Sequence, residues 1–450
     1  MVKTYVLDTN ILLSTEGRVI FGFDDNDVVI THTTMEELDL KKEVGGEVGY
    51  QARECIRILI RLLENKKKDE TIIDGIHLES GGTLRLVTNH LDSKMPKGWS
   101  LDRADNRILC TTKTLADSSE SKVILITNDG NMRFKASMLE VDAQSYQNDQ
   151  TVEDEFYTGR VTIENVDKTM VTDMFREHNL DIERVDKDIN LNENEFITIK
   201  DYNNGSVLGW KKGNTIKHIS SEDKTVFGIT SKNTGQRFAL EALLAPVDEI
   251  PLVILKGPAG CGKTLLSLAA GLDGSYDSKK TRLYDKVVIT RSNTLSDEDL
   301  GFLPGDLEDK MAPLLAPFFD NLKFLIGKNI EEKAQVNIQI EDMIEEGVIE
   351  ITSLSYIRGR SLTNTFLIVD EAQNLTRLQA KTIVTRMGMG SKLVILGDPN
   401  QIDNPKLDKK NNGLAYLSEK FKDSPLCAQV EFTNKESVRS KLAIEAINRL

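Results

Sequence analysis

The sequence is poor in cysteine and contains no long apolar run. Its four cysteines are scattered without Cys-x-x-Cys spacing, which argues against a zinc site and for a reducing, cytoplasmic location. No apolar run approaches the ~18–20 residues that would span a membrane. The first residues also lack the apolar core of a signal peptide. We therefore expect a cytoplasmic protein without a membrane partner.

Positive charge is also in deficit, because the formal net charge is −14. A bulk basic surface for gripping nucleic acid is therefore excluded, and any nucleic-acid binding is expected in a local groove. The chain has 450 residues, which is too long for one typical domain. Strands alternating with helices predict an α/β fold with parallel sheets.

The clearest motif is the phosphate-binding loop pattern G-x-x-x-x-G-K-T. It follows an apolar run at 252–255 and precedes a helical pattern, which is the strand-loop-helix context that the motif requires. Glycines allow the backbone N–H groups to point at phosphate oxygens, and the following helix adds its positive N-terminus. The loop comprises Gly257, Pro258, Ala259, Gly260, Cys261, Gly262, Lys263 and Thr264. We expect Lys263 to reach the β and γ phosphates of ATP and Thr264 to hold Mg²⁺.

A second acidic motif follows the apolar run 366–369. Asp370 and Glu371 come directly after this predicted buried strand, as in a Walker B pattern. Asp370 would hold a Mg²⁺-bound water, and Glu371 would orient the attacking water. Another predicted strand at 393–396 is followed by Gln401, which would sense the γ-phosphate. A turn-rich loop is predicted at 301–306. The segment 355–360 is a candidate contact for nucleic acid or for another subunit, and a plain exposed loop is the alternative.

Residues 1–140 carry acidic side chains at the ends of predicted strands and on nearby helices. Ligands bind beyond the carboxyl ends of parallel strands, and converging carboxylates require a cation such as Mg²⁺ or Mn²⁺. Such ions can activate water for phosphodiester cleavage. Taken one at a time, these acids also fit ordinary turn or helix-cap roles. The candidates are Asp8, Glu36 or Glu37, Asp102 or Asp105, and Asp129.

The ordered set of acids resembles the PIN-domain nucleases. In that pattern an early Asp, a Glu-Leu, an Asp-Asn and a Thr-Asn-Asp match Asp8, Glu37, Asp105 and Asp129. Glu36 and Asp102 lie close enough to leave the second and third assignments open. The resemblance implies metal-dependent cleavage of single-stranded RNA.

A small β-rich module is predicted between the two motif-bearing regions. A polar, acidic segment at 142–155 has the composition of a linker, and Asn-Gly at 204–205 predicts a hairpin. Tyr202 or Trp210 would be available to stack on bases, although filling a small core is the more common role. The predicted domains are 1–142, 143–225 and 226–450.

The motifs from residue 226 onward resemble the PhoH-type ATPases, relatives of superfamily 1 helicases. Gln236, at a helix start before the phosphate loop, resembles the adenine-reading Gln of helicase-like ATPases. The whole chain resembles the PIN–PhoH fusion proteins, which implies a PIN-like domain, a β-rich connector and a RecA-like P-loop core. It implies ATP-dependent RNA unwinding coupled to a ribonuclease.

The length of the last region leads to a further expectation. Superfamily 1 helicases use two motor cores, but only 52 of the 450 residues follow Asp398. An arginine acting on the γ-phosphate would then come from a neighbouring subunit. Arg439 matches an Arg-Ser pair of the family pattern, so we expect a ring, most simply a homohexamer. A solvent-exposed arginine at a helix start is the alternative interpretation.

The preferred hypothesis is an ATP-driven RNA motor that feeds single strands to a metal-dependent nuclease. One alternative keeps the ATPase but makes the PIN fold a non-catalytic RNA-binding module. The other is a nucleotide-switched scaffold. The sequence does not specify the RNA sequence, the direction of movement or DNA activity.

Overall fold

The computed structural model divides the chain into two compact units, Met1–Asp154 and Glu155–Leu450, which are described separately. It describes residues 2–146, 157–185, 189–203, 205–220, 224–276, 282–292, 307–328, 333–357, 359–404 and 407–438. The predicted loop 301–306, Arg358 and Arg439 lie outside these ranges. Among the helices of the described ranges, none has the length and apolar character needed to cross a bilayer.

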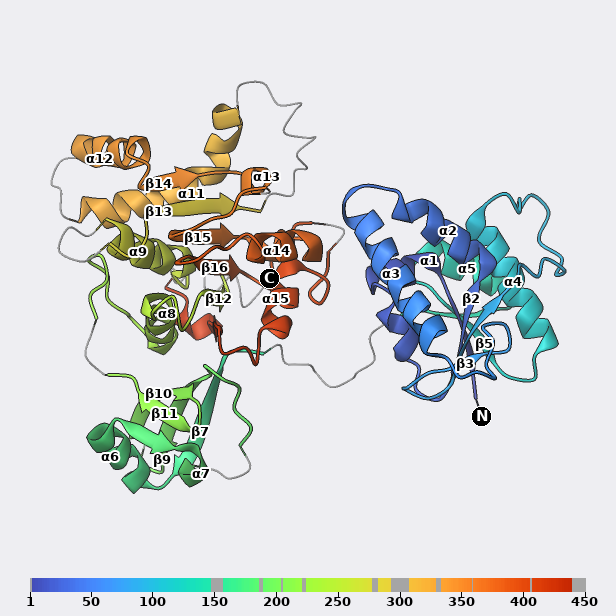
Figure 1. Ribbon diagram of the computed structural model, residues 1–450, viewed down its shortest axis with the longest axis horizontal. Helices are drawn as coiled ribbons and strands as arrows, with labels where there is room; N and C mark the ends of the chain where they lie inside the picture. The colour runs from blue at the N-terminus through green and yellow to red at the C-terminus, as the bar shows by residue number, and fades with distance from the viewer. Residues whose placement is uncertain are drawn as a thin grey trace. The chain divides into compact units, whose positions relative to one another are not determined.

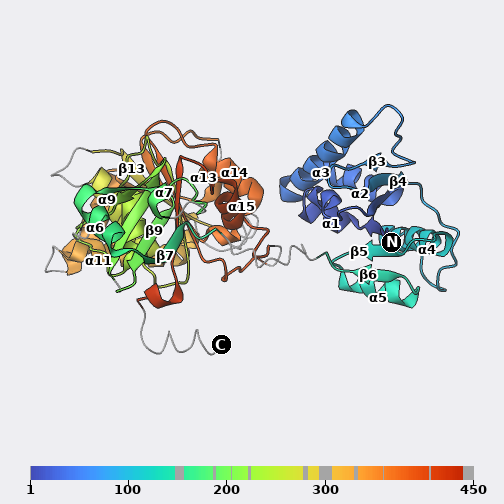
Figure 2. The same cartoon turned by 90° about the horizontal axis from the view of Figure 1, so that it is seen from below.

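The first unit is a three-layer α/β domain. Its six-stranded sheet has the order β3-β4-β2-β1-β5-β6, and every pair except β3–β4 is parallel. Figure 2 shows α1–α3 on one side of these strands and α4 and α5 on the other. The elements are β1 (Thr4–Leu7), α1 (Thr9–Ser14), η1 (Arg18–Phe21), β2 (Asp27–Thr31), α2 (His32–Lys42), α3 (Gly46–Asn65), β3 (Ile76–His77), β4 (Thr83–Val87), α4 (Ala104–Ser118), β5 (Val123–Ile126), α5 (Gly130–Met138) and β6 (Asp142–Gln144).

Alternating apolar residues explain why helices cover both faces of this sheet. Along β1, Val6 belongs to the core beneath α4 and α5, whereas Leu7 belongs to the core beneath α1–α3. Successive strand side chains point to opposite faces, so a strand buried on both faces is apolar at consecutive positions. Residues 142–144, expected to begin the linker, instead form β6, because they pair with β5 in parallel register.

The second unit begins with the β-rich module. Its five strands are ordered β7-β9-β10-β11-β8, and β9 and β10 form the predicted antiparallel hairpin. Residue 204 of the expected turn lies outside the described residues. The elements are β7 (Arg160–Val166), α6 (Lys168–Glu177), β8 (Asn179–Asp181), α7 (Ile182–Val185), β9 (Phe196–Asp201), β10 (Ser206–Lys212) and β11 (Thr215–His218).

The module has a small core of its own, but it also packs against the rest of the unit. Phe196 stacks on Trp210 at 4.9 Å and on Phe238 of α8 at 4.8 Å between ring centroids. Figure 1 shows α8 between the module and the main sheet. Trp210 also donates a hydrogen bond to the Asn194 carbonyl, so it fills the core, whereas Tyr202 is exposed.

The main sheet of the second unit carries the nucleotide motifs. It has the order β14-β13-β15-β16-β12-β17, and all neighbours are parallel. The elements are α8 (Thr234–Leu244), β12 (Leu252–Lys256), α9 (Lys263–Ser275), β13 (Lys286–Arg291), α11 (Leu307–Gly327), α12 (Lys333–Glu345), β14 (Ile349–Ile351), α13 (Leu354–Ile357), β15 (Thr365–Asp370), η2 (Ala372–Asn374), α14 (Arg377–Val384), β16 (Lys392–Gly397), α15 (Gly413–Lys420), β17 (Cys427–Glu431) and η3 (Asn434–Glu436).

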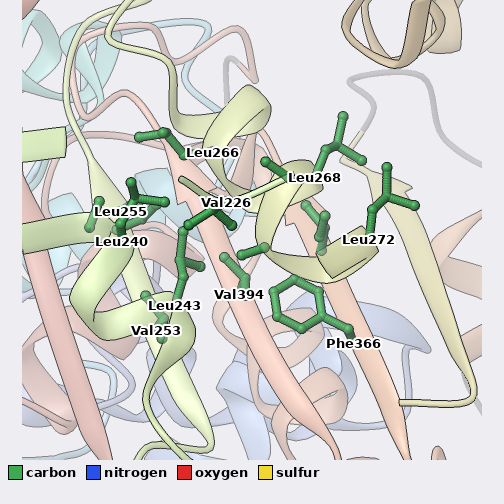
Figure 3. Close-up of a cluster of buried hydrophobic side chains, with 14 of the residues drawn as sticks. Val226, Leu240, Leu243, Val253, Leu255, Leu266, Leu268, Leu272, Phe366 and Val394 are labelled. Atoms are coloured by element: carbon green, nitrogen blue, oxygen red, sulfur yellow. The ribbon is translucent and has the colours of Figure 1, made fainter. Parts of the chain in front are cut away.

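Two apolar layers sandwich this sheet. Val253 and Leu255 face the layer of α8 and α9, which Figure 3 shows with Leu240, Leu266 and Leu268. The alternate residues Leu252 and Ile254 face the layer of α14 and α15 instead. The strands are therefore fixed on both sides, and the loops at their carboxyl ends are held by a rigid scaffold.

Candidate active sites

The nucleotide motifs meet at the carboxyl edge of the second unit's sheet. The phosphate loop follows β12, the acidic pair ends β15, and the segment with Gln401 follows β16. Because β16 lies between β15 and β12, the three loops are neighbours. Residues more than 100 positions apart in sequence are thereby brought to one place, as predicted for a ligand site of a parallel sheet.

Gly257, Gly260 and Gly262 of the phosphate loop all have a left-handed φ. Gly257 has a φ of 137°, and a Cβ there would lie 2.7 Å from the Phe432 carbonyl oxygen. Gly262 has a φ of 90° at the N-cap of α9. Residues other than glycine rarely adopt these angles, so the loop conformation depends on the three glycines.

Lys263 is buried beside the loop that it would serve. Its Nζ donates to the carbonyl oxygens of Gly257 at 2.5 Å and Pro258 at 3.1 Å. Burial lowers the pKa of Lys263, while the acids around it act in the opposite direction. A phosphate group would supply the negative charge that this buried ammonium lacks.

Thr264 and Asp370 form the candidate cation position. The Thr264 hydroxyl points to the Asp370 carboxylate, at 3.5 Å between Oγ1 and Oδ2. Burial and then the neighbouring Glu371 raise the pKa of Asp370 to about 6. A hydroxyl and a buried carboxylate are oxygen donors of the kind that Mg²⁺ prefers, and a cation would relieve the cost of the buried charge.

Glu371 is held by contacts that the sequence did not reveal. It adopts a left-handed φ of 55°, and its Oε1 lies 3.1 Å from Nη2 of Arg291 at the end of β13. Gln373 donates to the other Glu371 oxygen and to the Gln401 carbonyl, and its own Oε1 accepts from the Asp398 N–H at 3.0 Å. Arg291 and Gln373 therefore position the acidic motif. The signal available in the sequence was their position: Arg291 ends the strand β13, and Gln373 follows Glu371 by two residues.

Gln401 and Gln236 differ in how firmly they are engaged. Gln401 is exposed and donates to Asp398 Oδ2 at 2.8 Å. Gln236 is buried, donates to the Cys261 carbonyl at 3.0 Å and accepts from the Lys232 N–H at 2.9 Å. Gln236 thus braces the phosphate loop in this structure, and adenine recognition by its remaining hydrogen-bonding capacity stays a prediction.

In the first unit, Asp8 is the centre of the acidic group. It is buried at the end of β1, and its Oδ2 accepts from the Thr127 hydroxyl at 2.8 Å. Burial raises the pKa of Asp8, and the nearby charges of Asp105 and Glu37 add to this effect, whereas the Thr127 hydrogen bond opposes it. Asp8 makes no side-chain hydrogen bond to the N-terminus of α1, so it is not an ordinary helix cap.

The acidic alternatives that the sequence left open have different surroundings, and their roles as metal ligands stay predictions. Glu37 accepts from the Thr9 hydroxyl at 2.5 Å, next to Asp8. Glu36 is turned to His32, at 3.4 Å, and to Arg107 instead. The side chain of Asp102 accepts from the Ser100 hydroxyl at 2.7 Å, whereas Asp105 acts on the Asp8 charge.

Asp129 has a local role in addition to its place at the end of β5. Its carboxylate caps α5 by accepting from the N–H groups of Asn131 and Met132. Its own N–H donates to the Thr127 hydroxyl at 3.1 Å, so Thr127 connects Asp129 to Asp8. Thr127 was not singled out as a site residue, although it stands in the Thr-Asn-Asp pattern.

The acidic group fits a divalent cation by its chemistry. Carboxylate oxygens are suitable ligands for Mg²⁺ or Mn²⁺, and the mutual repulsion around Asp8 would be relieved by such an ion. Within the described ranges, however, no three His, Cys, Asp or Glu side chains converge closely enough to hold an ion as they stand. Glu37 and Asp129 each use one carboxylate oxygen in their present hydrogen bonds with Thr9 and α5.

Comparisons with known proteins agree with this two-part organisation. The PIN domain profile matches residues 5–147, and the PhoH-like protein profile matches residues 228–450. Protein PhoH2 of Bacillus subtilis is 38% identical over 454 residues, covering 98% of each chain. Proteins named PhoH2 from Thermobispora bispora and Mycolicibacterium smegmatis are each 32% identical and cover 98% of this chain and 95% of their own. The chain therefore belongs to the PhoH2 family, in which a PIN domain is joined to a PhoH-type P-loop domain.

Proposed function

We propose that this protein is an ATP-dependent RNA helicase or translocase that acts with a metal-dependent, single-strand endoribonuclease in the cytoplasm. The observation that carries the proposal is the meeting of Lys263, Thr264, Asp370 and Glu371 at one sheet edge. The acids around Asp8 form a second group in the PIN domain. RNA enters the proposal through the family, not through a contact seen in the structure.

In the ATPase reaction the residues have distinct tasks. Lys263 and the loop N–H groups bind the β and γ phosphates. Thr264 would hold Mg²⁺ directly and Asp370 would hold it through a bound water, and the ion would neutralise developing phosphate charge. Glu371 orients the attacking water, and Arg291 and Gln373 hold its carboxylate in place. Gln401 responds to the γ-phosphate from the neighbouring strand end.

In the nuclease reaction Asp8, Glu37, Asp105 and Asp129 would hold Mg²⁺ or Mn²⁺, which lowers the pKa of a bound water. Thr127 and Thr9 orient Asp8 and Glu37. One observation favours the alternative of a non-catalytic RNA-binding PIN domain: among the described residues, no three acidic, histidine or cysteine side chains converge closely enough to hold an ion. The two hypotheses differ in whether Asp8 is needed for cleavage.

The decisive experiment measures ATP hydrolysis and RNA cleavage together, with and without single-stranded RNA. We expect Asp8→Asn to abolish RNA cleavage and preserve ATPase activity. Glu371→Gln should abolish ATP hydrolysis and preserve RNA cleavage. If RNA leaves the wild-type ATPase rate unchanged, the proposed motor is wrong. Cleavage that survives in Asp8→Asn supports the RNA-binding alternative.

We further propose a homohexameric ring in which Arg439 of one subunit acts on ATP bound to the next. Subunit mixing tests this, because Lys263→Ala and Arg439→Ala subunits would each restore what the other lacks. Mixed rings, verified by native mass spectrometry, should regain ATPase activity. Failure of every verified mixture would count against action of Arg439 across the subunit boundary.

A further inference from the structure

The first described residues of the second unit lie along the edge of the nucleotide-binding sheet. β17 is the last strand in the sheet order, and the Thr158 carbonyl accepts from the Glu431 N–H at its end, at 2.9 Å. Gly159 passes so close to β17 that a Cβ would lie 2.0 Å from the Gln429 carbonyl oxygen. The segment 157–160, which we call the strap, is therefore fitted to this edge.

The strap contacts the residue that precedes the phosphate loop. Lys256 is buried, and its Nζ donates to the Tyr157 carbonyl and, at 2.7 Å, to the Ser418 hydroxyl. Its charge is balanced by Glu431, whose Oε2 lies 3.7 Å away. The start of the loop at Gly257 is thus tied to the strap through its neighbour in the chain.

At the other end of the strap, Arg160 binds Glu436. Arg160 donates two hydrogen bonds to the Glu436 carboxylate, at 2.9 and 2.8 Å, and the two side chains are only 17% and 12% exposed. Glu436 also accepts from the Gly235 N–H at 2.8 Å and the Thr433 N–H at 2.9 Å. Paired, two-pronged Arg–carboxylate bonds are among the stronger and more directional hydrogen bonds in proteins.

The two residues after Glu436 contact the phosphate loop itself. The Ser437 hydroxyl donates to the Ala259 carbonyl at 3.2 Å, and the Val438 N–H donates to the Gly260 carbonyl at 2.9 Å. In a planar trans peptide the C=O and the following N–H point in opposite directions. Bonds that fix these two carbonyls therefore also fix the directions of the Gly260 and Cys261 N–H groups.

We propose that Arg160 is a positioning residue of the nucleotide site. By holding Glu436, it keeps Ser437 and Val438 against the loop and pre-orients two N–H groups that would bind phosphate. The inference rests on the proposed nucleotide function, which it deepens. Since loop N–H groups bind phosphate before and during reaction, their loss raises KM rather than lowering kcat.

The test uses the full chain and compares Arg160→Met, Arg160→Lys and Glu436→Gln with a matched control, Lys200→Met. Lys200 forms an ion pair with Glu164 at 2.8 Å in the same module, away from the loop contacts described above. Binding of Mg²⁺-ADP is measured by calorimetry, and ATPase KM and kcat by steady-state kinetics. In a Trp99→Phe background, Trp210 fluorescence verifies that the second unit of each variant is folded.

We expect Arg160→Met to raise the Kd for ADP and the KM for ATP about tenfold, with kcat within about twofold of wild type. Arg160→Lys should give Kd and KM values between those of wild type and Arg160→Met, because a single amine replaces the two parallel hydrogen bonds of the guanidinium. Arg160→Met combined with Glu436→Gln should be no worse than the poorer single variant, since both break one contact. Lys200→Met should match wild type.

Two outcomes overturn the inference alone. A folded Arg160→Met protein that binds ADP as wild type does, or one that loses kcat with unchanged KM, shows that Arg160 does not position the loop. If Arg160→Met fails to fold, the same criteria apply to Arg160→Lys. A wild-type protein that binds no nucleotide would instead refute the proposed function, and the inference with it.

Discussion

Asp370→Asn should stabilise the second unit while abolishing ATP hydrolysis. The Asp370 carboxyl has a pKa raised to about 6 from 3.8, first by burial and then by Glu371. Ionising it in the folded protein therefore costs about 3 kcal/mol at pH 8 relative to the unfolded chain. Asparagine removes this cost and can still accept from the Glu371 N–H, which lies 3.0 Å from Oδ1. Since the amide must also be desolvated, we expect a net gain of about 2 kcal/mol.

The sign of the pH dependence is a further part of this prediction. Because the folded pKa is raised, the penalty is absent below pH 3.8, grows as pH rises, and is complete above about pH 6. Wild type and Asp370→Asn should therefore differ most at pH 8 and less at pH 5. Mg²⁺-ADP should stabilise wild type strongly and the variant weakly, since the variant lacks the charge that holds the cation.

Urea unfolding in the presence of a chelator provides the assay. The chain has two tryptophans, Trp99 in the first unit and Trp210 in the second, so a Trp99→Phe background leaves fluorescence that reports the second unit. Asp423→Asn, at an exposed aspartate, is the matched control and should change stability little. If Asp370→Asn is no more stable than wild type at pH 8, the burial argument is wrong.

Three other changes test particular contacts. Gly159→Ala should destabilise the second unit by more than about 2 kcal/mol in urea unfolding, because its Cβ would overlap the Gln429 carbonyl. Gly213 also has a positive φ, but a Cβ there would have nothing within 4 Å, so Gly213→Ala should cost about 1 kcal/mol. Thr127→Val should reduce RNA cleavage at least tenfold without changing ATPase activity, because Asp8 loses a hydrogen bond. The control Thr111→Val should leave both activities unchanged, because in the described structure the buried Thr111 hydroxyl has no hydrogen-bond partner. Burial acts to raise the pKa of Glu436, but hydrogen bonds from Arg160 and the Thr433 N–H outweigh burial and lower this pKa. The stability advantage of wild type over Glu436→Gln should therefore be complete above pH 4.5 and disappear as the pH falls through the lower pKa of the folded state.

Each of these predictions has a contrary result. Equal destabilisation by the two glycine variants would show that strain at positive φ, not the contact with Gln429, decides the cost. Unchanged RNA cleavage in Thr127→Val would remove Thr127 from the site. A difference between wild type and Glu436→Gln that does not change as the pH falls below 4.5 would mean that the Glu436 charge does not stabilise the fold.

The sequence by itself determined the phosphate loop, the acidic pair and the strands that precede them. These features follow from short-range patterns: a buried parallel strand is a continuous apolar run, and the loop after it must carry glycine and charge. The acidic candidates of the PIN domain came from the same kind of pattern, and their roles stay predictions. Glu36 and Glu37 are adjacent in the sequence, so only the packing of α2 shows which of them contacts Thr9.

Only the tertiary structure decided which distant residues support these motifs. Arg160 and Glu436 are 276 positions apart, and Gln236 braces Cys261 across 25 residues. The β-rich module has a small core of its own, but only the tertiary structure shows that it packs on α8 through Phe196 and Phe238. Contacts of this kind depend on the order of strands in the sheet and on which faces are buried, and neither is encoded within a short window of sequence.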